Sequence, residues 1–174
     1  MTRALQSVAS GALDVVANAN TPVGQAPVTI AATAGLALIA WRREPGAAWL
    51  GAGLFAIVAG AGLLMKLALV HPPPPAEYVR ALWDPLGFGV PTPSAFPSGH
   101  IARVGFLAIF AVGLASGTWV RVALVALIVW TFWSRVYIGD HWISDAVGGL
   151  ALGTAAGCAA VAWVIRCRGY DRSR

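Results

Sequence analysis

Five apolar segments dominate this sequence of 174 residues and limit what it can fold into. A helix needs roughly 20 predominantly apolar residues to cross a bilayer. Only 11% of the residues are charged, whereas an ordinary soluble domain has about 25%. The sequence therefore predicts an all-α, polytopic membrane bundle, folded as a single domain over residues 1–174. Its five transmembrane helices are expected at about 23–41, 47–70, 99–116, 119–138 and 141–165.

Two further segments are expected at the membrane surface. Residues 4–16 are too few to span, and polar positions interrupt their apolar ones, which predicts an N-terminal amphipathic helix. The loop 71–98 opens with His71 and four prolines, which are extended and stiff. Residues 76–83 within this loop can form two turns of a short interfacial helix.

The basic residues predict the orientation of the bundle. The net charge of +5 arises from 12 Lys and Arg against 7 Asp and Glu, gathered at the ends of the spans. The loops 42–46 and 116–121 and the C-terminal tail fall on one side in a five-span arrangement, and the positive-inside rule assigns that side to the cytoplasm. The loop 71–98 and the turn 134–141 then face outward from the cell (inner or plasma) membrane. No nucleic-acid partner is expected, because the basic residues form no stripe.

Two polar islands fall on the outward face. Lys66 lies near the outer end of the second span, and alone it is best explained as a lysine that snorkels to the membrane surface. Pro97-Ser98-Gly99-His100 opens the third span. Ser98 can cap that helix, Gly99 allows a ligand to approach the backbone, and free N–H groups at a helix N-terminus can bind an anion such as phosphate. An ordinary capped helix with an interfacial histidine explains the same residues.

The third island covers residues 134–145. If its last part is helical, His141 and Asp145 share one face a turn apart, which places a nucleophile beside a carboxylate that can orient it. Gly139 can end the fourth span and Asp140 can cap the fifth. Charged groups at membrane depth are costly and usually mark function. Such a pair alone is more often a surface hydrogen bond, but all three islands lie at the same membrane face.

The islands resemble the motifs of the type 2 phosphatidic acid phosphatase superfamily, which are K-x6-R-P, P-S-G-H and S-R-x5-H-x3-D. The second motif matches in full at Pro97–His100, and the third matches at Ser134, Arg135, His141 and Asp145. The first is incomplete, because Pro73 stands where the arginine after Lys66 is expected. The resemblance covers about residues 60–160.

This resemblance implies a phosphatase that works through a phosphohistidine and needs no metal or other cofactor. His141 would be the nucleophile, Asp145 would orient it, and His100 would be the general acid and base. The phosphate would be bound by Lys66, Ser98, Gly99, Ser134 and Arg135. A further cation or histidine would replace the missing arginine, with Arg80, Arg103 and His71 as the candidates.

The implied partners are membrane lipids, and the implied substrate is a phosphate monoester or diphosphate of a lipid. Phosphatidate, phosphatidylglycerol phosphate and a polyprenyl diphosphate such as undecaprenyl diphosphate all fit. Pro73 favours one alternative, an inactive protein that only binds lipid phosphates. A vanadate-dependent haloperoxidase-like enzyme is a second alternative, since that class shares the motifs but resembles soluble helical proteins. The sequence does not determine the oligomeric state.

Overall fold

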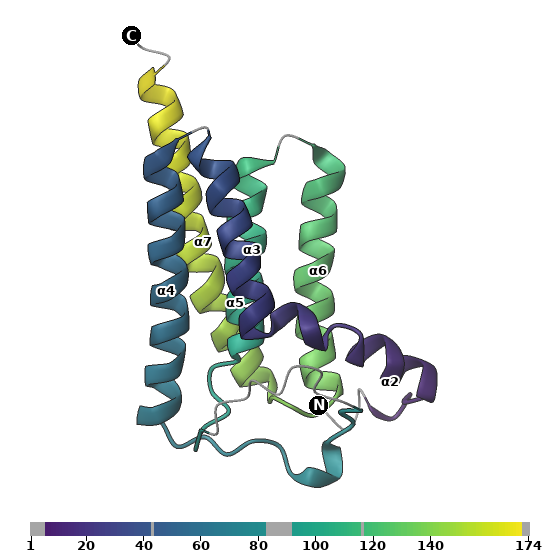
Figure 1. Cartoon of the computed structure of the whole chain (residues 1–174). Helices are drawn as coiled ribbons and strands as arrows, with labels where there is room; N and C mark the ends of the chain where they lie inside the picture. The colour runs from purple at the N-terminus through teal and green to yellow at the C-terminus, as the bar shows by residue number, and fades with distance from the viewer. Residues whose placement is uncertain (1–5, 43, 83–91, 116, 172–174) are drawn as a thin grey trace.

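The computed structural model describes residues 6–42, 44–82, 92–115 and 117–171, and this part of the chain is helical with irregular connections and no strand (Figure 1). The two short 3-10 helices are η1 and η2. In chain order the elements are α2 (Gly11–Asn18), η1 (Thr21–Gly24), α3 (Ala26–Trp41), α4 (Pro45–Ala68), η2 (Ala76–Tyr78), α5 (Gly99–Leu114), α6 (Thr118–Tyr137) and α7 (Ile143–Asp171).

The predicted class, a polytopic helical bundle, is confirmed. α4, α6 and the first 24 residues of α7 are long and apolar enough to cross a membrane. α3 qualifies as a fourth span only together with the segment Gly11–Gly24, from which it is bent by 58°. α5 is a shorter apolar helix of 16 residues. The count of five spans therefore stays a prediction.

The three basic segments lie at one end of the bundle. The α3–α4 and α5–α6 connections and the C-terminal end of α7 meet there, whereas α2, η2 and the α6–α7 turn lie at the other end (Figure 1). Trp41, Trp49 and Trp119 at the first end are exposed, so they are not core residues. This arrangement agrees with the predicted topology, and the side of the membrane that each end faces stays a prediction.

Proline determines where several helices begin and end. η1, α3 and α4 each have a proline in their first turn, where its missing N–H would have no partner in the helix. α4 ends at Ala68, shortly before the run Pro72-Pro73-Pro74-Pro75, which cannot continue a helix. The loop that follows therefore starts at the end of the bundle that carries the polar islands.

Two predicted surface helices differ from the structure. Within the predicted N-terminal helix 4–16, residues 7–10 are not helical, and α2 begins at Gly11, where Ser10 caps it by accepting the Leu13 N–H. In the loop 71–98, the helix is a single 3-10 turn, Ala76–Tyr78, and residues 83–91 lie outside the described residues. The predicted second turn is absent from the described residues 79–82, because their backbone N–H groups bind elsewhere. Arg80 donates to the Ile138 carbonyl at 2.8 Å, and Leu82 donates to the Asn18 side chain at 2.9 Å.

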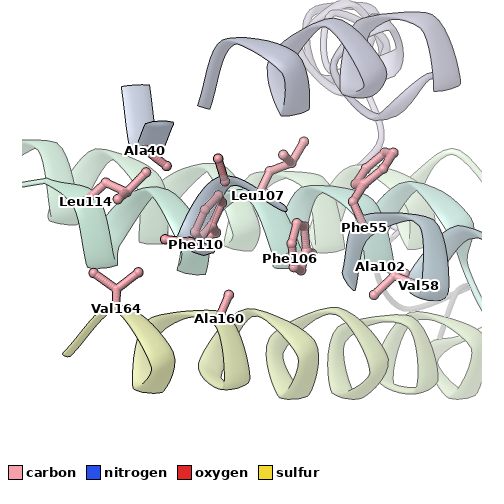
Figure 2. Close-up of a cluster of buried hydrophobic side chains, with 12 residues drawn as sticks. Ala40, Phe55, Val58, Ala102, Phe106, Leu107, Phe110, Leu114, Ala160 and Val164 are labelled. Carbon is pink, nitrogen blue, oxygen red and sulfur yellow. The ribbon is translucent and has the colours of Figure 1, made fainter. Parts of the chain in front are cut away.

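α5 is the central helix of the bundle and contacts α3, α4, α6 and α7. Its Phe106 and Phe110 rings stack with centroids 5.9 Å apart. Phe55 of α4 packs against Phe106, and Ala160 and Val164 of α7 close the same cluster (Figure 2). The core therefore holds α4, α5 and α7 together, and α5 and α7 share the most extensive interface.

Glycines set the distance between α5 and α7. Gly149, Gly153 and Gly157 follow one another at four-residue intervals on α7 and face α5. A Cβ at Gly149 or Gly153 would collide with the backbone carbonyl of Ser98 or Ala102. Small residues at such intervals allow helix backbones in membranes to approach closely. The helices that carry His100 of the second motif and Asp145 of the third motif are therefore in direct backbone contact.

Replacing Gly153 with alanine should destabilise the bundle. The new Cβ meets main chain that cannot rotate away, and overpacking of this kind costs about 1–3 kcal/mol. Gly60→Ala on α4 is the matched control, because a Cβ there has nothing within 4 Å. Thermal unfolding in detergent should give a lower Tm for Gly153→Ala and an unchanged or higher Tm for Gly60→Ala. Equal Tm values for the two variants would contradict the close approach.

Candidate active site

His141 and Asp145 lie together, although not on one helical face. α7 begins at Ile143, so the predicted helical placement of His141 is wrong, and His141 belongs to the preceding turn. The turn nevertheless brings the His141 Nδ1 to 3.5 Å from the Asp145 Oδ2. The same oxygen accepts the Trp142 N–H at 2.9 Å, as an acidic residue in the first turn of a helix often does. Asp145 rather than Asp140 therefore accepts the backbone N–H group at the start of α7.

The turn before His141 is closed by the backbone of Arg135. The Arg135 carbonyl accepts the N–H groups of Asp140 and His141 at 3.2 and 3.3 Å. Gly139 ends α6 as predicted, with φ of +79°, and a Cβ there would collide with the backbone of Tyr78. The position of His141 is therefore determined by main-chain contacts on both sides of the turn.

The Asp145 carboxylate lies between two histidines and is fully buried. Its Oδ1 is 3.1 Å from the Nε2 of His71, which follows α4 and is partly exposed. The His71 ring also packs edge-on against Phe96. A buried carboxylate requires hydrogen bonds or positive partners to offset its lost hydration. His71 thus contacts the Asp145 carboxylate and is not among the residues that line the neighbouring cavity.

The second motif is joined to the third through the backbone. Ser98 precedes α5 as predicted, but its hydroxyl makes no capping bond and has no partner in the described part of the chain. Its N–H donates to the Asp145 carbonyl at 2.9 Å. The ring of His100, in the first turn of α5, is hydrogen-bonded to the backbone of Thr21, while its Nε2 is buried and has no partner among the described residues.

Arg135 is buried and held from three sides. Its Nη2 donates to the Thr21 hydroxyl at 2.8 Å, and its Nη1 donates to Asp140 at 3.0 Å. Its Nε lies 3.4 Å from the hydroxyl of Ser134, which in turn donates to Asn20 at 3.3 Å. The sequence prediction did not include Thr21 or Asn20, because neither belongs to a motif.

A cavity of about 290 Å³ opens between α3, α4, α5 and the α6–α7 turn. Lys66, Arg103, both motif histidines, Gly99 and Thr92 line it, together with apolar residues of α3, α4 and α5. The Lys66 ammonium donates to the carbonyls of Ser94 and Ala95 at 3.1 and 3.0 Å. Two cations beside a helix N-terminus are suited to bind an anion such as phosphate.

The two arginines proposed to replace the missing one occupy different places. Arg103 lines the cavity, and its Nε and Nη2 both donate to the Gly24 carbonyl, at 3.2 and 2.7 Å. Arg80 instead binds both carboxylate oxygens of Asp14, at 2.7 and 2.8 Å, and does not line the cavity. This pairing with Arg80 lowers the pKa of Asp14 below its usual value. Geometry therefore favours Arg103.

The predicted site residues form two layers. Lys66, Gly99, His100, Arg103 and His141 line the cavity. Ser98, Ser134, Arg135 and Asp145 are buried outside its lining. The described residues contain no cluster of three or more His, Cys, Asp or Glu arranged to hold a metal ion.

Fold and site define a helical membrane protein whose histidines and cations converge on an anion-sized cavity at one end of the bundle. The chain belongs to the PAP2 superfamily, whose family model matches residues 46–168. The resemblance found in the motifs is therefore confirmed. The match leaves out the whole chain before α4, including α2, η1 and α3, although this segment contacts the site.

Curated relatives and solved structures agree with this assignment. Lipid A 1-phosphatases of Rhizobium etli and Rhizobium johnstonii are each 36% identical, over 111 and 110 residues. These matches cover 60% of the chain and 46% and 44% of the relatives, so the chain spans less than half the length of the curated relatives it matches. Both curated relatives are phosphatases by name.

Two crystal structures share the fold. A PAP2-type phosphatidylglycerolphosphate phosphatase from Bacillus subtilis superposes with a TM-score of 0.69 at 19% identity, covering 99% of this chain and 83% of the other. Aquifex aeolicus LpxE gives a TM-score of 0.68 at 18% identity, covering 92% of each chain. At these identities the likeness concerns the arrangement of helices.

Proposed function

We propose that this protein is an integral-membrane lipid phosphatase that cleaves a phosphate monoester or diphosphate through a phosphohistidine. One observation carries the proposal: His141, beside the buried carboxylate of Asp145, lines the cavity on which Lys66, Arg103 and His100 converge. Nucleophile, orienting group, acid and phosphate-binding cations are thus present within one site. The names of the relatives support the same class of reaction.

In the first step, the phosphate enters the cavity and binds Lys66, Arg103 and the N–H groups at the start of α5. These donors stabilise the charge on the equatorial oxygens of the transition state. Arg135 lies close to His100 and adds positive charge from outside the cavity lining. The ammonium and guanidinium groups are already held by backbone carbonyls, so little reorganisation accompanies binding.

In the second step, the Nε2 of His141 attacks phosphorus while the bond to the leaving oxygen breaks. Asp145 accepts the Nδ1–H, which fixes the tautomer and stabilises the imidazolium. The distance of 3.5 Å is long for a hydrogen bond, and such bonds commonly tighten when substrate binds. The negative charge of the bound phosphate favours uptake of a proton by His100, which gives this proton to the leaving oxygen. Neutral His100 then takes a proton from water, which attacks phosphorus and releases orthophosphate and His141.

The apolar wall of the cavity favours a lipid over a soluble phosphate ester. Val58, Ala59 and Leu63 of α4 lie beside the cations and belong to a span. A phosphate head can therefore bind among the cations while its tail stays at membrane depth. We place the site on the outer face of the cell membrane and the C-terminus in the cytoplasm, following the basic loops.

Orthophosphate release from a substrate panel in mixed micelles tests this function. The panel contains lipid A, phosphatidylglycerol phosphate, phosphatidate and undecaprenyl diphosphate. Glycerol 3-phosphate and glucose 1-phosphate serve as tail-free controls. We expect release from at least one lipid at a kcat/KM well above that of the tail-free esters. No release from any lipid, or equal release from the soluble esters, would contradict the proposal.

Arg103 and Arg80 should respond differently to substitution by alanine. Arg103→Ala removes a guanidinium from the cavity, and loss of one charge-assisted contact should lower kcat/KM by roughly 10- to 100-fold. Arg80→Ala removes the pair with Asp14 and should lower the Tm while leaving kcat/KM within about 2-fold, because surface pairs contribute little to distant chemistry. Steady-state kinetics and thermal unfolding measure both. Unchanged kinetics for Arg103→Ala would show that Arg103 does not replace the arginine that is missing from the first motif.

A further inference from the structure

The segment 20–24, which precedes the family match, contacts four polar side chains of the site, namely His100, Arg103, Ser134 and Arg135. We infer that it is a working part of the active site, in which Thr21 is a positioning residue for Arg135 and His100. This inference rests on the proposed function and identifies residues that no motif contains. η1, which directly precedes the bend at the start of α3, brings the segment against α5.

Thr21 bonds to both a cation and a histidine. Its hydroxyl accepts from the Nη2 of Arg135 at 2.8 Å, and its backbone is hydrogen-bonded to the His100 ring. Because the His100 Nε2 has no partner among the described residues, this backbone bond uses Nδ1. One residue thus fixes the direction of the Arg135 fork and the orientation of the His100 ring.

Gly24 completes the same arrangement. Its carbonyl accepts two bonds from Arg103, and its Cα lies directly against the His100 ring, where a Cβ would collide with three ring and side-chain carbons. The neighbouring Asn20 accepts from Ser134. Three residues of this short segment therefore bind His100 of the second motif, Ser134 and Arg135 of the third motif, and Arg103 of the cavity.

The contacts are suited to positioning. A guanidinium buried among fixed acceptors keeps one geometry, and preorganised charge is the main source of transition-state stabilisation. Removing an acceptor from a buried charged donor leaves that donor unsatisfied, which costs more than an ordinary neutral bond. If Thr21 only filled space, removal of its hydroxyl would change stability but not the binding of a transition-state analogue.

Thr21→Val tests the inference, because it keeps the shape of the side chain and removes the acceptor. Thr29→Val is the matched control, since Thr29 is also buried and its hydroxyl bonds to the carbonyls of Gln25 and Ala26. Thr21→Ser restores the hydroxyl. We expect Thr21→Val to lower kcat/KM on the best lipid substrate roughly 10- to 100-fold, chiefly through kcat. Thr21→Ser should stay within about 3-fold of the wild type, and Thr29→Val should match the wild type.

Protection against thermal unfolding by orthovanadate provides a readout that does not depend on turnover. Vanadate should raise the Tm of the wild type, of Thr21→Ser and of Thr29→Val, and should raise that of Thr21→Val less. The inference fails if Thr21→Val keeps the kinetics and vanadate protection of the wild type, or if Thr29→Val loses as much. If the wild type is inactive on every lipid, but vanadate raises its Tm more than that of Thr21→Val, the proposed reaction is wrong and the positioning role of Thr21 stands.

Discussion

Replacing His141 with alanine should abolish phosphate release, lowering kcat by roughly 10⁴-fold or more. The reason is that His141 supplies the bonding electron pair, and no other described side chain lines the cavity beside Asp145 in a position to replace it. The fold should survive, because the backbone of the turn is held by the Arg135 carbonyl and by Gly139 rather than by the imidazole. The measurement is orthophosphate release in detergent, with the Tm and vanadate protection recorded for the same preparation.

A trapping experiment distinguishes covalent catalysis from general-base catalysis by His141. With p-nitrophenyl phosphate, the leaving group departs without a proton, so His100→Ala should still be phosphorylated but should be slow to hydrolyse the intermediate. A labelled phosphoenzyme that is stable in alkali and labile in acid should accumulate in His100→Ala and be absent from His141→Ala. Full turnover by His141→Ala, or label that persists without His141, would disprove the scheme.

Asp145→Asn should lower kcat by about 10³- to 10⁴-fold while changing KM little. An amide is nearly the same size as the carboxylate, and its oxygen can still accept the Trp142 N–H that starts α7. However, the neutral amide cannot stabilise an imidazolium at His141, and its N–H₂ group takes the place of the oxygen that faces His71. The result should be an intact protein whose nucleophile loses the charge that stabilises its phosphorylated form.

Asp14→Asn is the control for this substitution. Asp14 also binds a cation, but it lies beside Arg80 and Tyr137 and does not line the cavity. Its variant should lose stability and keep kcat. Steady-state kinetics and thermal unfolding of the two variants should therefore give opposite patterns. Activity retained in Asp145→Asn would mean that the carboxylate has only its structural role at the start of α7.

The parts predicted best from sequence were those that depend on short spacing. Apolar length indicated the helical bundle, and the motif spacing brought His141, Asp145 and Arg135 together. The local form was less predictable. His141 lies in a turn because its N–H bonds to the Arg135 carbonyl, a choice between turn and helix that the pattern of residue types does not determine.

Contacts between distant segments could not be predicted in the same way. Thr21 and Gly24 meet Arg135 and Arg103 only because the chain bends by 58° between the segment Gly11–Gly24 and α3. Arg80 and Arg103 look equivalent in the sequence. In the structure, Arg80 forms an ion pair with Asp14 and is held away from the cavity. A signal was present in the small and polar residues around position 21, which no apolar span requires, but it did not specify a partner.

The close contact between α5 and α7 also bears on which substitutions this protein can accept. Ser98 and Asp145 are joined through an N–H and a carbonyl, which almost any amino acid would provide. The contact nevertheless requires Gly149, four residues beyond Asp145 and outside the motif, because a methyl group there would push the two helices apart. Tolerance to mutation should therefore be lowest at positions with the smallest side chains, and a search restricted to the reactive residues would overlook them.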